Sequence, residues 1–380
     1  MTSPANPTET NTPVDLLVVG GGLMGLGVAW RCAARGMRVR LLDRGDLGRG
    51  ASWAAAGMLA PCTEAQFHED AVYALSAQSQ ALWPQFAADV EAASGQSVGF
   101  DTCGSIVVAL DRDDDAAQRR HFAYQQSLGM QVERMSGAAL REREPLLSPK
   151  VIAGTWSPVE HQVDNRLLVD ALIAACVAHG VELEPHRAVT EVRVDAGEVG
   201  GAVADDGVLL PARAVLIAGG AWSRAIEGLG DVTPPVRPVK GQMLSLATEP
   251  SYQLAHVIRS AYGYIAPKAD RWVVGATSED RGFDVRVTAG GVWHLLDGAR
   301  DPGRPAARQP RHRPHHGRLR RARPVLLHRP LPPRRADDAG LGRRCGRLHR
   351  RRARLVHART VQRAALRRGS HAWLTPRRYT

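Results

Sequence analysis

The sequence predicts an α/β fold with a Rossmann-like nucleotide-binding domain and an α+β domain built on an antiparallel sheet. A glycine-rich turn between an apolar strand and a helical segment, within residues 14–45, predicts the first domain. Strand-like alternation at 235–244 and 264–284 predicts the second. An abrupt change of composition at residue 302 limits this fold to the preceding part of the chain, and residues 302–380 are predicted not to fold natively.

The net charge of +12 averages two unlike parts of the 380-residue chain. Of the 50 Lys and Arg residues, 24 arginines follow Asp301, together with only two of the 38 acidic residues. Residues 302–380 therefore carry +22 and residues 1–301 carry −10. An acidic body with a basic tail is typical of a protein that binds nucleic acid or an acidic surface, so the tail is a candidate for such binding.

Cysteine usage and the N-terminus indicate a cytoplasmic protein without a metal site. Five cysteines, at positions 32, 62, 103, 176 and 345, show neither metal-ligand nor CxxC spacing, which argues against structural zinc and disulfides. Residues 1–12 are polar and rich in Pro and Thr, so we expect a short disordered lead rather than a secretory signal. No run approaches the ~18 apolar residues of a membrane span.

The front of the chain carries three glycines at the spacing of a dinucleotide-binding turn. Gly20 permits a tight turn, Gly22 lets the backbone approach a pyrophosphate, and Gly25 lets the helix pack on the strand. The helix N-terminus favours the phosphate charge, and Asp43 can accept hydrogen bonds from ribose hydroxyls. The alternative is an ordinary glycine-rich turn without a ligand. The predicted contacts to the dinucleotide are Gly20, Gly22, Leu23, Met24, Gly25, Leu42 and Asp43.

A segment of small side chains follows Asp43. Residues 48–61, GRGASWAAAGMLAP, offer a helix start against which a bulky flat ring can lie, although a tightly packed core helix has the same composition. The residues predicted to contact the ring are Ala51, Ser52, Ala55, Ala56 and Gly57. The buried strand within 213–223 ends in Gly219 and Gly220, where a ligand can come close unless this is a plain strand-to-helix turn.

These segments resemble the D-amino acid oxidase family of FAD-dependent enzymes, and within it the glycine oxidases of thiamine biosynthesis. GASWAAAGMLAP, LREREPLLSP, PVRPVKGQML and YIAPKADRWVVGATSEDRGFD carry the resemblance, which runs from Val14 to about Asp301. It implies FAD as the cofactor, a discontinuous FAD-binding domain of 13–62 and 151–222, and a substrate domain of 63–150 and 223–301. It also implies backbone contacts from Val189 to the adenine region, and a contact of the Tyr264 hydroxyl with the substrate carboxylate.

The resemblance implies oxidation of glycine or a small D-amino acid. Hydride leaves the substrate Cα, the imine is hydrolysed or passed to thiazole synthesis, and dioxygen reoxidises the flavin to give peroxide. No side chain acts as an obligatory base in this family, so catalysis rests on positioning the Cα–H bond and binding the carboxylate. A homo-oligomer is expected of the intact family form. A sarcosine oxidase or a D-amino acid dehydrogenase-like flavoenzyme is the alternative.

Residues 302–380 lack the two motifs that complete the family's site. The substrate arginine lies in a GLRP motif, followed by GHYRNG or a similar turn, and neither occurs here. Read one nucleotide later, the codons of HRPLPPRR (328–335) permit TGHYRRG, and the same shift from Arg304 permits GLRPGSPDTAPI. We hypothesise that a non-triplet deletion near codons 301–303 put the tail out of frame and impairs this chain. The alternative is a genuine nucleic-acid-binding tail, whose DNA binding should weaken with salt.

Overall fold

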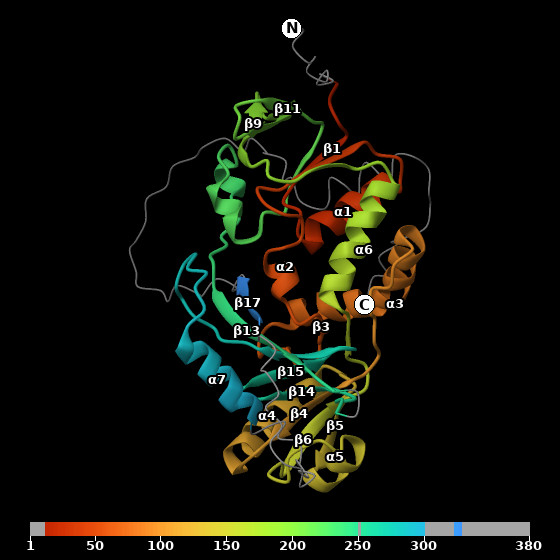
Figure 1. Cartoon of the computed structure of the whole chain (residues 1–380), viewed down its shortest axis with the longest axis vertical. Helices are drawn as coiled ribbons and strands as arrows, with labels where there is room; N and C mark the ends of the chain where they lie inside the picture. The colour runs from red at the N-terminus through yellow and green to blue at the C-terminus, as the bar shows by residue number, and fades with distance from the viewer. Residues whose placement is uncertain (1–11, 250–251, 301–322, 329–380) are drawn as a thin grey trace, which may run out of the picture. The chain divides into compact units, whose positions relative to one another are not determined.

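A computed structural model describes residues 12–249, 252–300 and 323–328. The predicted lead and most of the predicted aberrant tail lie outside the described residues. The chain divides into two compact units (Figure 1). Among the described residues, the first unit comprises the chain up to Leu47 and His179–Val236, and the second comprises Gly48–Ala178 and the described residues from Arg237 onward. These units rest on compactness and not on ligand contacts, so the domains predicted from the sequence, with boundaries near 62, 150 and 222, stay a prediction.

The first unit contains a four-stranded parallel sheet of order β12-β1-β2-β8. Its strands are β1 (Leu16–Val19), β2 (Val39–Leu42), β8 (Glu182–Glu184) and β12 (Val215–Ile217), and helix α1 (Leu23–Ala33) connects β1 to β2. All four residues of β1 are buried, as expected for a central strand of a parallel sheet. The last residues of β1, β2 and β12 are in register, so the turns that follow these strands start at one edge of the sheet.

An antiparallel sheet of order β11-β10-β9 adds to the first unit. It consists of β9 (Val189–Asp195), β10 (Glu198–Ala204) and β11 (Leu209–Pro211), and two short 3-10 helices follow β12, η1 (Gly220–Ala225) and η2 (Gly230–Val232). Val192 and Ala202 from this sheet share one apolar cluster with Leu17 and Leu42 of the parallel sheet. The two sheets therefore belong to a single hydrophobic core.

The second unit is built on an eight-stranded sheet of order β17-β13-β16-β15-β14-β4-β6-β5. Its strands are β4 (Ser105–Ala109), β5 (Glu133–Ser136), β6 (Ala153–Ser157), β13 (Lys240–Ala247), β14 (Val257–Ser260), β15 (Gly263–Pro267), β16 (Arg271–Gly275) and β17 (Arg323–His328). Its helices are α2 (Ala51–Ala54), α3 (Asp70–Ser94), α4 (Arg112–Ser127), α5 (Gly137–Arg143), α6 (Asn165–Ala178) and α7 (Ala289–Arg300). A ribbon of β3 (Met58–Leu59) and β7 (His161–Gln162) completes the unit. The pairs in the large sheet are antiparallel except β14 with β4.

The two faces of this sheet carry separate apolar clusters. Ile265 packs in the cluster that includes Leu295 of α7, whereas the next residue, Ala266, packs in a cluster with Met243 and Ala56. This alternation follows from the two-residue period of a strand. The sheet therefore has one face toward α7 and one face toward the small-residue segment after α2.

The predicted fold class is confirmed by the parallel Rossmann-like sheet and the separate antiparallel sheet. Helix α3 continues without a break from Asp70 to Ser94, although Pro84 lies inside it. The ring of Trp83 lies edge-on to Phe86 and stacked on Phe100, and we attribute the continuity to packing that offsets the hydrogen bond lost at proline.

Strand β17 is the described part of the predicted aberrant tail. It pairs antiparallel with β13, with Lys240 opposite His328 and Ser245 opposite Arg323. This pairing uses peptide groups that an edge strand would leave unpaired.

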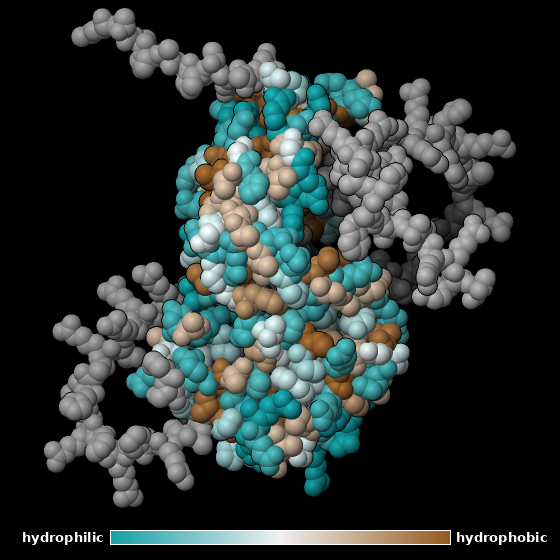
Figure 2. All heavy atoms as spheres, turned by 90° about the vertical axis from the view of Figure 1, so that its right-hand side faces the viewer, coloured by the Kyte–Doolittle hydropathy of each residue, from teal (hydrophilic) through white to brown (hydrophobic). Residues whose placement is uncertain are grey.

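The surface shown in Figure 2 intersperses apolar and hydrophilic residues. Exposed apolar side chains include Val72, Leu75 and Leu82 of α3. Within the described ranges, no helix has the length and apolar character that crossing a membrane requires.

Candidate active site

The glycine turn after β1 is held by contacts between backbones. Gly20 has φ +108°, a conformation that side chains disfavour, and a Cβ there would lie 2.5 Å from the Ala218 carbonyl oxygen and 2.9 Å from Gly219 N. A Cβ on Gly25 would collide with the Gly20 carbonyl oxygen. The turn after β1 and the turn after β12 therefore touch directly, which brings the predicted Gly20 and Gly219 together.

Helix α1 begins without a side-chain cap. Gly22 is its N-cap residue, and no acidic residue lies in its first turn. The partial positive charge of the helix end is thus not offset by a first-turn carboxylate. Of the predicted contacts Leu23 and Met24, which open this helix, Met24 has a side chain 77 % exposed, so a contact from Met24 to a ligand at the turn would use its backbone.

Asp43 ties the glycine turn to the end of β2. Its Oδ2 accepts the Gly21 N–H at 2.7 Å, and its Oδ1 accepts the Gly45 N–H at 2.8 Å. The preceding predicted residue, Leu42, accepts the Gly20 N–H through its carbonyl at 2.8 Å. Each carboxylate oxygen has a second lone pair, so the predicted bond from a ribose hydroxyl remains compatible with this geometry.

The remaining predicted contacts of the first unit lie near these turns. Gly220, with φ +55°, begins η1 immediately after Gly219. Val189 begins β9, and two residues before it the Arg187 N–H donates to the Asp43 carbonyl at 2.9 Å. Val189 is thus on a chain segment that runs beside the end of β2.

Sequence reasoning missed a cation–aromatic pair at the same edge. The Arg44 guanidinium lies 3.8 Å from the centre of the Trp222 ring. Arg44 directly follows Asp43, and Trp222 is two residues after Gly220, so the pair joins the turn after β2 to the turn after β12. Only the proximity of each residue to a predicted contact could have indicated it from the sequence.

In the second unit, the small-residue segment is packed from behind. Gly57 has φ +71°, and a Cβ there would collide with the Val163 carbonyl oxygen. The Val163 N–H donates to the Gly57 carbonyl at 2.8 Å. Of the other predicted ring contacts, Ala51 and Ser52 lie in α2, and Ala55 and Ala56 follow it. Ala56 is buried, whereas Ala51, Ser52 and Ala55 are partly exposed.

Sequence reasoning missed a backbone donor, the Met58 N–H, at the edge of β3 that faces away from β7. Gly57 and Val163 form the hydrogen-bonded pair, so the N–H and C=O of Met58, the next residue, point away from β7. The backbone of Gln162, opposite Met58, bonds instead to Asp101 on its other side, at 2.8 and 2.9 Å. Met58 thus presents its backbone at the free edge of the ribbon.

Tyr264 lies on the sheet face that also carries Ala56. It is in β15 opposite Gly275 of β16, and its hydroxyl lies 3.8 Å from the Met243 sulfur. A Cβ on Gly275 would lie 2.6 Å from the Tyr264 hydroxyl, so the phenol occupies the space that glycine leaves. Tyr264 and Ala56 belong to one apolar cluster, which places the predicted substrate tyrosine and the predicted ring contacts together within the second unit.

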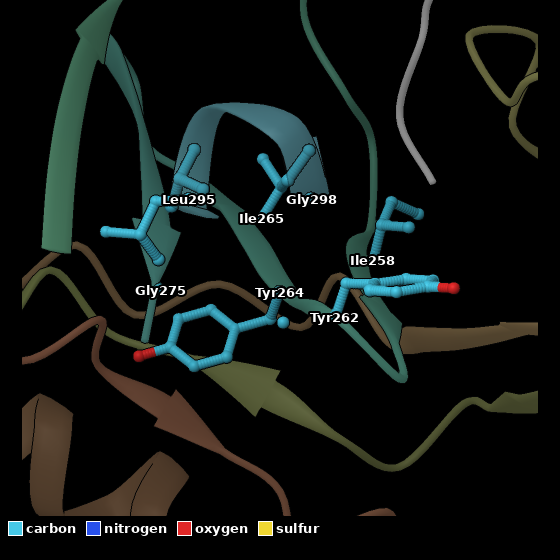
Figure 3. A pocket seen from close by; sticks show the side chains of 9 residues that line it. Ile258, Tyr262, Tyr264, Ile265, Gly275, Leu295 and Gly298 are labelled. Carbon is cyan, nitrogen blue, oxygen red and sulfur yellow. The ribbon is translucent and has the colours of Figure 1, made fainter. Parts of the chain in front are cut away.

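The cavity in Figure 3 lies on the other face of the sheet. Its lining includes Ile258, Ile265, Val274 and Leu295, which belong to the cluster on the α7 side. Tyr264 and Gly275 also line it, but the Tyr264 ring points away from α7 in this view. The Tyr264 hydroxyl instead lies beside Met243, in the cluster on the opposite face.

Arg259 is a cation beside Tyr264 that sequence reasoning missed. It lies directly opposite Tyr264 in the β14–β15 pair, and its guanidinium carbon is 6.0 Å from the tyrosine ring centre. Its Nη1 pairs with Glu64 Oε1 at 2.9 Å.

Two thiols near this face are held in the protonated form. Cys103 packs in the same apolar cluster as Tyr264, and burial raises the pKa of its thiol to about 12. Burial likewise raises the pKa of the Cys62 thiol to about 12, and the Glu160 carboxylate adds to this effect.

Comparison with known proteins identifies the family. The model of the FAD dependent oxidoreductase (DAO) family matches residues 15–325. The chain belongs to this family. The glycine oxidase of Geobacillus kaustophilus is 32 % identical over 284 residues, which cover 74 % of this chain and 74 % of that protein. The bifunctional protein ThiO/ThiG of Trichormus variabilis is 33 % identical over 75 % of this chain, but the match spans only 43 % of that longer protein.

Solved structures agree with this family assignment. The crystal structure of glycine oxidase from Geobacillus kaustophilus has a TM-score of 0.72 at 29 % identity, with coverage of 84 % of this chain and 83 % of that chain. Glycine oxidase from Bacillus cereus has a TM-score of 0.73 at 25 % identity, with coverage of 83 % of each chain. FAD is therefore the cofactor of this oxidoreductase.

The described residues fit FAD in both units. In the first, the close backbone contacts of Gly20 and Gly25 shape a tight turn before the uncapped start of α1, whose backbone N–H groups can bind a diphosphate. In the second, the buried Asn165 donates its Nδ2 to the carbonyls of Ser52 at 2.7 Å and Trp53 at 2.9 Å, which fixes the orientation of the amide. Its Oδ1 is buried and has no hydrogen-bond partner among the described residues. This oxygen can accept a hydrogen bond from a flavin N3–H or from a ribityl hydroxyl.

Proposed function

We propose that this oxidoreductase oxidises glycine, or a small D-amino acid or amine, to the imine, which is hydrolysed to glyoxylate or the keto acid and ammonia. Two electrons and the Cα hydrogen leave the substrate, and dioxygen takes up the electrons as hydrogen peroxide. The observation that carries this proposal is the similarity to glycine oxidases over three-quarters of the chain. The position of Tyr264 on the same face as Ala56 supports it.

The residues of the chain have separate roles in this proposal. FAD supplies the hydride acceptor when it is bound. The Gly20, Gly22 and Gly25 turn holds the diphosphate, and Asp43 accepts from the ribose. The segment of Ala51, Ser52 and Ala55–Gly57 supports the ring. The Tyr264 hydroxyl donates to the substrate carboxylate and orients the Cα–H bond.

Among the described residues, the cation beside Tyr264 is Arg259, and Glu64 partly neutralises its charge. We infer that Arg259 does not replace the missing GLRP arginine, because its guanidinium already pairs with Glu64. A carboxylate bound by Tyr264 alone loses the bidentate ion pair that this class of site requires. We therefore propose that the chain binds FAD and has much reduced activity. The out-of-frame origin of residues 302–380 stays our hypothesis, since most of that tail lies outside the described residues.

The name of one relative supports a proposal for what happens to the imine after the reaction. The ThiO/ThiG protein is named as bifunctional, which supports a hand-off of the imine from this oxidase to thiazole synthesis. We propose the same hand-off here, in the cytoplasm, by a homo-oligomer of the frame-corrected chain. The basic tail as a nucleic-acid-binding arm is the competing proposal for residues 302–380.

Anaerobic mixing of the purified, FAD-loaded chain with glycine tests the function. We expect a flavin absorbance band that glycine bleaches slowly, and that glycine bleaches rapidly when the gene is corrected near codons 301–303. Sarcosine and D-alanine in parallel identify the preferred amine. A frame-corrected protein that binds FAD but is bleached by none of these amines contradicts the proposed reaction. Clean coding DNA across codons 295–310, with no family motif in either other frame, rules out the deletion.

A further inference from the structure

Lys268 is a buried lysine that the proposed reaction does not use. It directly follows the last residue of β15, the strand of Tyr264, and it is 8 % exposed. Its Nζ donates to the Gln162 side-chain oxygen at 2.8 Å and to the Val163 carbonyl at 3.0 Å. Burial lowers the pKa of Lys268 to about 8, although Asp164 opposes this shift. A lysine in such a place needs its hydrogen-bond partners.

Both acceptors belong to the segment that backs the small-residue turn. Gln162 is opposite Met58 in the ribbon, and the Val163 N–H donates to the Gly57 carbonyl. Lys268 therefore connects the end of the Tyr264 strand to the two residues that lie behind the Gly57–Met58 edge.

A second link runs parallel to this one. The Lys268 N–H donates to the Arg271 carbonyl at 2.7 Å, which closes the turn between β15 and β16. Arg271 Nη2 then binds both carboxylate oxygens of Asp164, at 3.0 and 2.8 Å. Asp164 in turn accepts the Arg166 N–H at the start of α6. The second link thus ends on α6, whereas the Lys268 ammonium contacts the residues opposite Gly57 and Met58.

We propose that Lys268 is a positioning residue that fixes the Gly57–Met58 edge relative to the strand of Tyr264. Within the second unit, this ammonium group links the segment that holds the ring to the strand that carries Tyr264. The inference rests on the proposed function only in assigning that edge to the flavin ring. The link itself is a property of the chain without cofactor.

Hydrogen–deuterium exchange of the full 380-residue chain without FAD tests the link. We expect Lys268→Met to reduce protection of peptides that span 57–60 and 161–164 by about tenfold, the effect of losing a charge-assisted bond. Peptides of β10 in the first unit should be unaffected. Lys150→Met, which removes an exposed lysine of the same unit, is the matched control. Unchanged protection at 57–60 in Lys268→Met overturns the proposal.

FAD titration is a second test, monitored by flavin fluorescence and by the visible absorbance band. The shape of that band does not change when a variant is merely less stable. Lys268→Met should raise the FAD dissociation constant about tenfold and change the shape of the bound-flavin band. Lys268→Arg, which keeps two charged donors, should restore both. If Lys268→Met does not fold, Lys268→Leu, which also lacks a donor, replaces it, and equal protection in the Leu and Arg variants overturns the proposal. A wild-type chain that binds no FAD contradicts the proposed function, while the exchange experiment still decides the role of Lys268.

Discussion

The two parts of the candidate site are stabilised by different kinds of contact. In the first unit, Gly20 and Gly25 place backbone directly against backbone, and Asp43 bonds to main-chain N–H groups. In the second unit, side chains from distant segments meet, with Tyr264 over Gly275 and Lys268 against Val163. Backbone contacts leave almost no freedom for substitution, whereas side-chain contacts can shift. The first region should therefore fail abruptly on mutation, and the second by degrees.

The largest effect is expected in the glycine turn. Gly25→Val places side-chain atoms against the Gly20 carbonyl, which belongs to the backbone and cannot move aside. We expect a loss of more than about 3 kcal/mol in unfolding free energy, together with loss of FAD binding, measured by thermal unfolding and by retained flavin. Gly27→Ala in the same helix is the control, because a Cβ there meets nothing within 4 Å. A folded, flavin-loaded Gly25→Val protein contradicts the backbone account.

The next effect is a pH dependence of stability from Lys268. Its folded pKa, about 8, lies below the unfolded value of 10.5, so between these values the unfolded chain binds more protons. The contribution of Lys268 to stability therefore rises with pH from about 8 to 10.5, by about 3 kcal/mol at most. The charged groups and thiol around it are Asp101, Cys103, Asp164 and Arg271.

Denaturant titrations of wild type and Lys268→Met over pH 7–10.5 isolate this contribution. The difference in unfolding free energy should move in favour of the wild type as the pH rises. Cys62 and Cys103 act in the opposite direction above pH 9, because their folded thiols stay protonated. Cys62 cancels in the difference, whereas Cys103 interacts with Lys268, so both proteins should carry Cys103→Ala. A difference that is flat with pH would falsify the assignment to Lys268.

A smaller effect is expected at Tyr264. Gly275→Ala brings a methyl group to 2.6 Å from the Tyr264 hydroxyl, and this far end of a side chain can move. We expect a folded, flavin-binding protein whose KM for glycine, measured in the frame-corrected form, rises about tenfold. Tyr264→Phe should show the same rise without a change in stability. Gly290→Ala, at an open position in α7, is the control, and a KM unchanged in both test variants removes Tyr264 from the site.

The smallest effect is expected from Arg44. Arg44→Ala removes the stack on Trp222 and should weaken FAD binding by about 0.5–1 kcal/mol. Arg31 lies 4.5 Å from the Trp30 ring in the same unit, so Arg31→Ala removes a similar stack away from the glycine turns. Isothermal titration with FAD compares the two. Equal losses in both variants mean that the Arg44 stack stabilises the fold without serving the site.

The sequence predicts the fold class and the glycine turn because their physical causes are local. Gly20, Gly22 and Gly25 lie within six residues, and each is required by a close approach that spacing alone makes visible. Lys268 and Arg259 were not predicted, because their partners are far away along the chain, at Val163 and Glu64. Hydrophobic periodicity along the sequence does not indicate which distant residues pair.

Met58 and Tyr264 show the limit of what the sequence alone predicts. Met58 directly follows the predicted Gly57, yet its role depends on which strand pairs with it, a property of β7 more than one hundred residues later. Tyr264 was predicted only through the family resemblance, since a tyrosine in a sheet is usually a half-buried aromatic. Its contact with Gly275 required the three-dimensional register.

The buried thiols have a consequence for the proposed reaction, which forms peroxide. Peroxide attacks thiolates far faster than thiols, and a thiol of pKa about 12 is deprotonated in only about one molecule in 100,000 at neutral pH. Cys103 packs with Tyr264, at the face where the proposed reaction takes place. The burial that packs the sheet therefore protects Cys62 and Cys103 from the peroxide of the proposed reaction.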